Sequence, residues 1–421
     1  MRILHVHKYY HDHDGAGRYM FDVMRLSEVA GHVVAPFAMH DPRNSPSPWD
    51  KYFVSSLDTS RIGFGLDGLR QLARAWWSRE AYQKISAMLK AFKPDVVHLH
   101  NIYTHLSPSV LAACREQGVP VIMTVHDYAL VSANYGLWDH DSLTSISARA
   151  SWLEVAQTRF IKNSFLATAL LDGIYRLQRR LGFYDRVIEV YLPSSEFVKK
   201  QLVAAGYPEK KIRVLPLFAG NLLGHGQGAD PLLTSPLSKG EKSPQREGVL
   251  FAGRLEDYKG IDLFLQAASA FPNVKFYSAG TGPLEGEVIE SIHRCPNLSY
   301  LGFVSGPELW AKMAEVELVV VPSRWAEPFG LVAVEAMACG TPVLVSDAGG
   351  LPEKLKAGAN GLIFKAGDIQ DLTTQLKIAL KNPADLKRMG QGAARFAKAQ
   401  ANPDKHMNQL FEAYAELVIH K

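Results

Sequence analysis

L-V-V-V-P-S-R-W-A-E-P-F-G-L-V-A-V-E-A-M-A-C-G-T-P-V-L-V-S, residues 318–346, reads as a complete strand, turn, helix, turn and strand. Val319 to Val321 form a β-branched run typical of a buried parallel strand. Phe329 to Cys339 are mostly helix formers, and Gly340 suits the left-handed residue that ends a helix. Val343 to Val345 form a second strand, so this stretch predicts one strand–helix–strand unit of a parallel sheet.

Two carboxylates accompany this unit. Glu327 precedes the predicted helix, where unpaired backbone N–H groups and the helix dipole favour an anion. Glu335 lies within an otherwise apolar helix, where a buried charge is costly unless it meets a polar partner. We expect Glu335 to have such a partner; a helix cap and an ordinary helix acid are the simpler interpretation of the pair.

Strands and helices alternate through the remainder of the chain. Longer helices are expected at residues 18–29, 66–90, 148–183 and 194–205. The predicted strands are residues 3–7, 33–37, 94–100, 119–125, 187–192 and 212–217, then 249–252, 274–278, 298–301, 318–321, 343–345 and 361–364. This alternation predicts an α/β fold with parallel sheets and crossover helices.

Length and composition narrow the class of protein. The chain has 421 residues, about enough for two domains, and a net charge of only +4, which gives no support for nucleic acid as a general partner. Cys114, Cys295 and Cys339 are widely spaced and form no metal-binding pattern, which fits a reducing cytoplasm. The start of the sequence resembles a strand rather than a signal peptide, and no apolar run is long enough to span a membrane.

Small and polar residues mark the expected ligand edge of the first half. Gly15 and Gly17 lie in the turn after the first strand, where they let the backbone approach a ligand closely. His126 follows a strand at the carboxyl edge, where open α/β sheets bind ligands. Asp127 faces the opposite way, so we expect no direct His–Asp dyad.

Two cations mark the corresponding edge of the second half. Arg254 follows a strand in G-R-L, and Lys259 lies in the turn before the next helix. Five residues apart across that turn, both can point into one crevice. A guanidinium fork and an ammonium point charge together suit phosphate oxygens.

Several motifs occur in a characteristic order in the second half: G-R-L-E-D-Y-K-G-I-D from Gly253, G-T-G-P-L, G-F-V, E-P-F-G-L and D-A-G-G-L-P-E ending at Glu353. With the E-x7-E spacing of Glu327 and Glu335, this series resembles the nucleotide-sugar domain of the retaining GT-B glycosyltransferases of family four. G-A-G-R, V-H-L-H-N-I-Y and T-V-H-D-Y extend the resemblance, less tightly, over the first half.

The resemblance implies a fold and a domain plan. The GT-B fold has two Rossmann-like domains with parallel sheets that face an interdomain cleft. Here it implies an N-terminal acceptor-side domain over residues 1–219 and a C-terminal nucleotide-sugar-binding domain over 248–402. Residues 220–247, rich in Gly, Pro, Ser and charge, are the expected flexible linker. Residues 403–421 are expected to form a helix that crosses back to the first domain.

The resemblance also implies roles for the marked residues. Arg254, Lys259, Glu327 and His126 form the expected catalytic set: the two cations neutralise the diphosphate, Glu327 holds hydroxyls of the donor sugar and His126 lies by that sugar. The remaining implied donor contacts are Glu335 on the ribose, the amides of Phe329, Gly330 and Leu331 at the diphosphate, Val304 by the base, and Gly15, Gly17 and Gly282 beside the nucleotide sugar.

Metal sites are the alternative way to stabilise a diphosphate. Asp12-His13-Asp14 and Asp139-His140-Asp141 are D-x-D strings, but both lie in turn-like segments without further ligands. His5, His7, His98 and His100 form H-x-H pairs on strands, which are more often ordinary sheet-edge histidines than metal ligands. We therefore expect no metal and no cofactor, and fixed cations instead.

The expected partners are a nucleotide-diphosphate sugar and a glycan or lipid-linked saccharide acceptor, in cell-surface polysaccharide synthesis. The base, the sugar, the acceptor and the linkage stay open, because loop shape and a few hydroxyl contacts set them. After H-D-Y, residues 133–147 lack the cysteines that many relatives carry, a departure that bears on the acceptor. A sugar-nucleotide epimerase and a non-catalytic nucleotide-sugar-binding protein are the alternatives. The paired Glu and E-P-F-G-L favour transfer.

A basic segment raises the question of membrane binding. Arg159 to Arg186 carries six basic residues against two acids, and Trp76-Trp77 lies elsewhere in the first half. The simpler interpretation is an amphipathic helix packed on the sheet with a solvated basic face. The alternative is a surface for anionic lipid on the inner face of the cytoplasmic membrane.

Overall fold

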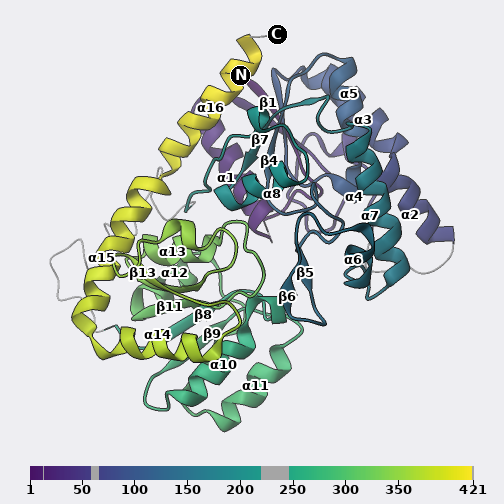
Figure 1. Cartoon of the computed structure of the whole chain (residues 1–421). Coiled ribbons are helices and arrows are strands. Elements are labelled where there is room, and N and C mark those ends of the chain that lie inside the picture. Colours follow the sequence, from purple (N-terminus) through teal and green to yellow (C-terminus); the bar gives the residue numbers. More distant parts are fainter. Residues whose placement is uncertain (13, 58–65, 220–245, 420–421) are drawn as a thin grey trace. The chain divides into compact units, whose positions relative to one another are not determined.

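The computed structural model describes residues 1–12, 14–57, 66–219 and 246–419 (Figure 1). It divides into two compact units, which we describe separately. Unit 1 comprises Met1–Leu137, Ile146–Leu215 and Met407–Lys421, and unit 2 comprises Trp138–Ser145 and Pro216–His406. The predicted linker, 220–247, lies outside the described residues except for its last two.

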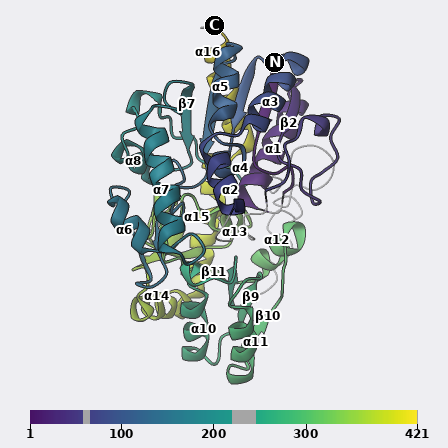
Figure 2. The same ribbon diagram turned by 90° about the vertical axis from the view of Figure 1, so that its right-hand side faces the viewer.

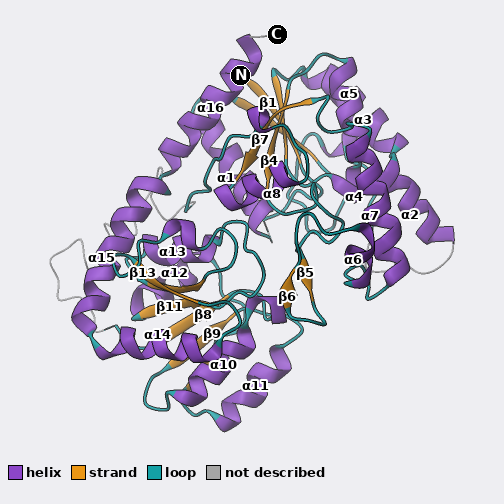
Figure 3. Ribbon diagram, in the orientation of Figure 1, coloured by secondary structure: helices purple, strands orange, loops and turns teal. Residues whose placement is uncertain are grey.

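Unit 1 is built on a five-stranded sheet in the order β2-β1-β3-β4-β7, with every neighbouring pair parallel. Figure 3 shows helices on both sides of these strands. The strands are β1 (Arg2–Val6), β2 (Val33–Phe37), β3 (Val96–Leu99), β4 (Val121–Val125) and β7 (Ile188–Pro193). The helices are α1 (Gly15–Val29), α2 (Leu66–Trp76), α3 (Arg79–Phe92), α4 (Tyr103–Leu106), α5 (Ser109–Glu116), α6 (Trp152–Gln157), α7 (Phe165–Arg180) and α8 (Glu196–Ala204).

Unit 2 has a six-stranded parallel sheet in the order β10-β9-β8-β11-β12-β13. Its strands are β8 (Val249–Ala252), β9 (Phe276–Ala279), β10 (Leu298–Tyr300), β11 (Leu318–Val321), β12 (Val343–Ser346) and β13 (Gly361–Phe364). Its helices are α10 (Ile261–Ala270), α11 (Glu285–Arg294), α12 (Gly306–Glu315), α13 (Leu331–Ala338), α14 (Ile369–Lys381) and α15 (Pro383–Gln400). A small hairpin, β5 (Trp138–Asp139) with β6 (Thr144–Ser145), also belongs to this unit and was not predicted.

The two sheets confirm the predicted fold class of two parallel-sheet, Rossmann-like units. The four residues of β11 are all buried, as expected of a strand covered on both faces. The predicted strand 212–217 is not a regular strand: it forms an isolated bridge between Ile212 and Tyr191, and the N–H groups of Arg213 and Leu215 donate to carbonyl oxygens of β7. Pro193 on β7 and Pro216 both lack an N–H donor, which prevents a regular ladder there.

Two predicted helices are each broken in the structure. Residues 66–90 form α2 and α3, because the side chain of Ser78 accepts the N–H of Ala81 and starts a new helix. Residues 148–183 form α6 and α7, separated by a turn in which Arg159, Lys162 and Asn163 have positive φ angles.

Helix α7 also corrects the simpler interpretation of the basic segment. Leu166, Leu170, Leu177 and Leu181 at its end are 40–52% exposed. At 100° per residue these four leucines fall within about 60° of arc on one face. The apolar face of this segment therefore faces solvent and does not pack on the sheet. Among the described residues, no helix is long and apolar enough to cross a membrane.

The last helix, α16 (Pro403–Ile419), begins in unit 2 and belongs to unit 1 from Met407 onward. In unit 1 the Tyr414 hydroxyl lies 2.6 Å from His98 Nδ1, and the ring of Phe411 packs 4.5 Å from that of His32. The end of the chain is therefore tied to strands formed by its beginning.

Candidate functional site

The strongest polar cluster of unit 2 lies where β11 ends and α13 begins (Figure 1). Lys259 Nζ is 2.5 Å from Glu327 Oε1, and the hydroxyl of Ser323 donates to the same oxygen at 2.9 Å. Burial raises the pKa of Glu327, but Lys259, Trp325 and Ser323 outweigh it and hold that pKa below its usual value. Glu327 is therefore a buried, ionised carboxylate paired with one lysine.

The turn that carries Lys259 is fastened to the segment after β11. The Arg324 guanidinium binds both oxygens of Asp262, at 2.5 and 2.6 Å, and the backbone N–H of Arg324 donates to Tyr258. Gly260 has φ +72°, and a Cβ there would lie 2.0 Å from the carbonyl oxygen of Pro322. Only glycine permits this approach, which explains K-G-I-D and fixes Lys259 opposite Glu327.

The glycines of D-A-G-G-L-P-E pack against the predicted anion-binding turn and hydrogen-bond to it. Helix α13 begins after Gly330, which has φ +81°. A Cβ on Gly349 would lie 2.4 Å from the carbonyl oxygen of Glu327, and the N–H of Gly350 donates to that oxygen at 2.7 Å. The amides of Phe329, Gly330 and Leu331 thus belong to a rigid turn at a helix amino end, a favourable place for an anion.

The other residues of unit 2 that we expected to contact the donor lie as follows. A Cβ on Gly282 would lie 2.5 Å from the carbonyl oxygen of Leu255, so G-T-G packs directly on G-R-L. Val304 is half-buried in the turn after β10. Glu335 is buried in α13. The exposed Arg254 side chain pairs with Glu256 in this structure.

Lys354 is a site residue that the sequence analysis missed. Its side chain is buried, with Nζ 2.7 Å from the carbonyl oxygen of Gly350 and 4.1 Å from the ring centroid of Phe329. Burial lowers the pKa of Lys354 to about 7, although Glu353 and Glu327 act in the opposite direction. The feature of the sequence that could have indicated Lys354 is its position directly after the D-A-G-G-L-P-E motif.

The carboxyl edge of unit 1 brings a second group together. Asp14 caps α1 by accepting the N–H of Gly17 at 2.6 Å, and Lys8 Nζ lies 3.9 Å from it. A Cβ on Gly17 would lie 2.3 Å from the carbonyl oxygen of His11, so the turn needs glycine at that position. Gly15 is the first residue of α1. The helix amino end and Lys8 make this edge suitable for an anion.

His126 follows β4 and is half-buried. Its Nε2 lies 3.0 Å from His100 Nδ1, and its ring is 5.3 Å from that of Tyr19. Burial lowers the pKa of His126 to about 4, so the ring is neutral at pH 7. Asp127 accepts the N–H of Ala129 instead of meeting His126.

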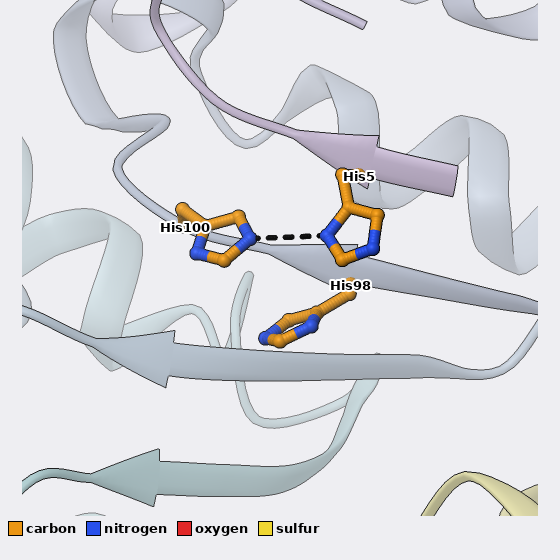
Figure 4. Close-up of side chains that lie close together, drawn as sticks. All are labelled: His5, His98 and His100. Carbon is orange, nitrogen blue, oxygen red and sulfur yellow. Dashed lines mark hydrogen bonds between the residues drawn. The ribbon is translucent and has the colours of Figure 1, made fainter. Parts of the chain in front are cut away.

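Among the described residues, His5, His98 and His100 are the group whose side-chain ligand atoms could surround a metal ion (Figure 4). All three are fully buried, and His98 uses both ring nitrogens for hydrogen bonds, to Tyr414 and Thr124. The Asp residues of both D-x-D strings also serve local structure: Asp14 caps α1, and Asp139 binds Asp141 and Ser142.

Comparison with known protein families covers both units. The family described as "Glycosyltransferase Family 4" matches residues 13–218, and the family described as "Glycosyl transferases group 1" matches residues 237–396. One relative, the sulfoquinovosyl transferase SQD2 of Arabidopsis thaliana, is 25% identical over 328 residues. That match covers 74% of this chain and 54% of the relative's length.

Solved structures agree in fold. A sucrose-phosphate synthase from Thermosynechococcus elongatus has a TM-score of 0.69 at 19% identity, with all of both chains covered. HepE of Anabaena in complex with UDP-glucose has a TM-score of 0.65 at 17% identity, with 99% of this chain and 100% of that chain covered. The chain therefore belongs to the group 1, family 4 glycosyltransferases and is a glycosyltransferase of the GT-B fold.

Proposed function

We propose that this glycosyltransferase moves a sugar, with retention of configuration, from a nucleoside-diphosphate sugar to a glycan or lipid-linked saccharide in cell-surface polysaccharide synthesis. The observation that carries the proposal is the ion pair between the half-buried Lys259 and the buried Glu327 beside the start of α13. A UDP-sugar is the first donor to test, because the HepE structure is a complex with UDP-glucose.

The pair suits the breaking of a bond between a sugar and a diphosphate. As the bond from the anomeric carbon to the phosphate oxygen breaks, negative charge grows on the leaving diphosphate. Lys259, Arg254 and the amides at the start of α13 provide positive charge and N–H donors for it. Glu327 accepts hydrogen bonds from hydroxyls of the donor sugar.

Retention then follows from attack on the face that the diphosphate leaves. The acceptor hydroxyl oxygen bonds to the anomeric carbon on that face, and its proton passes to the departing phosphate oxygen. Such a step requires positioning and charge stabilisation rather than a protein nucleophile. Glu327, already bound to Lys259 and Ser323, serves as a hydroxyl ligand.

Mutation tests the pair directly. Lys259→Ala and Glu327→Ala are each expected to lower kcat/KM by at least a hundredfold, since each removes a charged contact at the donor and breaks the ion pair, and Lys259→Ala also leaves the buried Glu327 carboxylate without its lysine. Lys275→Ala is the matched control, because Lys275 and Glu247 form an exposed ion pair in the same unit. Near-normal rates in both site variants would refute the placement of the site.

Ligand assays separate this activity from its alternatives. UDP-, GDP- and ADP-sugars are compared by thermal shift, because a ligand that binds only the native state raises Tm. An epimerase converts its donor without an acceptor, and a binding protein shows a shift without turnover. Transfer that occurs only with an acceptor supports the proposal.

We also propose that fixed cations replace a metal ion in this reaction. EDTA is then expected to leave kcat unchanged, and added Mn²⁺ is not expected to raise it. Activity that is lost with EDTA and restored by Mn²⁺ would instead indicate that the diphosphate requires a divalent ion.

A membrane surface on unit 1 supports a lipid-linked acceptor. Figures 1 and 2 show α6 beside α7, and Trp152 of α6 donates its Nε1–H to Ala169 of α7 at 2.8 Å. We call the exposed apolar residues of these helices and of the residue that follows α7 the α6–α7 surface: Trp152, Leu153, Phe165, Leu166, Leu170, Leu177 and Leu181, each 40–52% exposed. They form an apolar row on the outside of a folded unit.

Polar residues on the other face of α7 explain why the row faces outward. Asp172 accepts the N–H of Ala133 at 3.1 Å, and Gln178 donates to the carbonyl oxygen of Ala75 at 2.9 Å. Thr168 is fully buried as well. The buried face of α7 thus combines these hydrogen-bonded polar groups with Leu171 and Tyr175, which leaves the exposed leucines for another partner.

We propose anionic lipid as that partner because of the nearby positive charge. Arg159, Lys162, Arg180 and Arg186 are exposed on or beside the row. Each cation near an anionic leaflet contributes about 1 kcal/mol, and each half-exposed leucine adds roughly 1 kcal/mol on insertion. Together these contributions suffice for reversible membrane binding. The reduced, buried state of all three cysteines agrees with the cytoplasmic face.

Liposome flotation tests the surface. The protein is expected to float with vesicles rich in phosphatidylglycerol and to remain at the bottom with neutral phosphatidylcholine. Leu170→Glu with Leu177→Glu should abolish flotation. Ile289→Glu, at an exposed isoleucine of α11 in unit 2, should not. Equal flotation of both variants, or none by the wild type, would refute the membrane surface.

A further inference from the structure

Three imidazoles of unit 1 form a continuous hydrogen-bonded chain from the core to the carboxyl edge of the sheet. His126 Nε2 lies 3.0 Å from His100 Nδ1. His100 Nε2 in turn lies 3.3 Å from His5 Nδ1, the bond that is dashed in Figure 4. The rings stack, with interplanar angles of 24° and 18°. His5 lies within β1, and His100 and His126 directly follow β3 and β4. We call these residues the histidine chain.

The inner end of the histidine chain has no hydrogen-bonding partner. His5 is fully buried, and its Nε2 has no hydrogen bond to any described residue. The nearest alternative, His98, already bonds Tyr414 and Thr124 through its two nitrogens. The outer end, His126 Nδ1, belongs to the half-buried residue at the sheet edge.

The rings of the histidine chain are neutral at pH 7. Burial lowers the pKa of His5 to about 3 and that of His126 to about 4, and it lowers the pKa of His100 well below the usual value. Each ring therefore carries one N–H, and two hydrogen bonds between three rings allow only two arrangements.

The two arrangements differ in what is left at His5. If His126 donates inward, every ring is protonated on Nε2 and His5 keeps a buried N–H with no acceptor. If His5 donates outward through Nδ1, the unsatisfied atom is a lone pair on Nε2. Orphaned buried N–H donors are rarer than under-used acceptors, so the outward arrangement is favoured.

We propose that His5 and His100 are positioning residues that hold His126 as its Nδ1–H tautomer, so that His126 presents a hydrogen-bond donor at the sheet edge. The tautomer of a histidine is set by the bond that its other nitrogen makes, and here that bond is accepted from His100. His126 then donates to a sugar oxygen and has no free lone pair to act as a base. This role at the sugar rests on the proposed function.

A neighbouring histidine provides an internal reference. The backbone N–H of Asn101 donates to His7 Nδ1 at 3.2 Å, so neutral His7 must carry its proton on Nε2, where it has no hydrogen bond to a described residue. Asn101 forces this unpaired N–H on His7, whereas no backbone donor of a described residue forces one on His5. His7 directly follows β1, whereas His5 is the next-to-last residue of that strand. The structure thus assigns opposite tautomers to two histidines of the same segment.

Long-range ¹⁵N–¹H NMR of histidine-labelled protein at pH 7 tests the assignment without any substrate. His126 is expected to be protonated on Nδ1 and His7 on Nε2. Protonation of His126 on Nε2 would overturn the proposal. Signals are assigned with single His→Gln variants at each position.

Variants at His100 connect the tautomer with catalysis. His100→Asn places an N–H₂ donor where Nδ1 lies, so it should keep the His126 tautomer and near-normal kcat. His100→Leu removes the donor and should lose the tautomer and roughly tenfold in kcat, the effect of one hydrogen bond. His98→Gln, equally buried but outside the histidine chain, should leave the tautomer unchanged. Equal tautomers in all three variants would refute the positioning role.

The outcomes separate this inference from the proposed function. An Nδ1–H tautomer in a protein that transfers no sugar would confirm the histidine chain and reject the proposed function. An Nε2–H tautomer of His126 in an active transferase would reject the positioning role of the histidine chain and leave the proposed function standing.

Discussion

At the residue scale, the site depends on ionisable groups whose partners lie far away in the chain. Glu327 is ionised because Lys259 and Ser323 lie against it. Lys354, by contrast, is buried against a carbonyl oxygen and an aromatic ring. Unit 2 thus holds a Glu327 carboxylate whose charge is stabilised by its partners and a Lys354 amine whose charged form is destabilised by burial.

Lys354 predicts a pH dependence of stability. Its pKa is about 7 in the folded protein and about 10.4 when unfolded, so between these values the unfolded chain binds more protons. The free energy of unfolding should therefore rise with pH across this window, by up to about 1.4 kcal/mol per pH unit from this group.

Urea denaturation at pH 7, 8.5 and 10 measures this dependence. Lys354→Met should flatten the rise, whereas Lys377→Met, at an exposed lysine of α14, should keep it. A wild-type protein whose stability does not change over this range would contradict the burial of a protonatable Lys354.

At the element scale, the β11–α13 unit is held in shape by glycines from the next turn. Gly349 and Gly358 both have positive φ, at +65° and +72°, but only Gly349 faces a close backbone atom. A side chain would be strained by the positive φ at either glycine, but only at Gly349 would it also clash with the backbone of Glu327.

Gly349→Ala should accordingly disturb the donor site. We expect it to lower the affinity for the donor at least tenfold and to cost more than 2 kcal/mol of stability, roughly, because the backbone of Glu327 must move. Gly358→Ala should cost only about 1 kcal/mol and leave affinity unchanged. Calorimetric titration with the donor checks both, and equal affinities would show that the turn tolerates the shift.

At the scale of the whole molecule, the last helix joins the strands of the first unit. Tyr414 bonds His98 across 316 positions of sequence, and both side chains are fully buried. Removing the hydroxyl leaves His98 Nδ1 without this partner, in a place that water does not reach.

Tyr414→Phe should therefore lower the free energy of unfolding of unit 1 by about 1–3 kcal/mol. Tyr82→Phe is the control, because its hydroxyl bonds the exposed Glu116 side chain, which water can solvate. Hydrogen exchange of the β3 amides gives a local readout. Unchanged exchange in Tyr414→Phe would mean that α16 contributes little to the sheet.

The sequence alone was sufficient for the strands of both sheets, most of the helices and the family, but not for the β5–β6 hairpin or the irregular segment 212–217. Alternation of β-branched runs with helix formers predicted both parallel sheets, since these patterns depend on neighbouring residues. Residues such as Lys259 and Glu327 were found because their motif is local and ordered. The breaks at Ser78 and at residues 158–164 were missed, since they depend on caps and left-handed residues whose cost only the packed structure offsets.

The sequence by itself determined that this protein is a two-unit α/β glycosyltransferase with a conventional donor motif. Only the tertiary structure decided which face of α7 is buried, that Lys354 belongs to the site, and that His5, His100 and His126 form one chain. Periodicity shows which residues share a face but not what covers that face. Contacts between strands and buried charges depend on the complete fold, which brings together groups that the sequence keeps far apart.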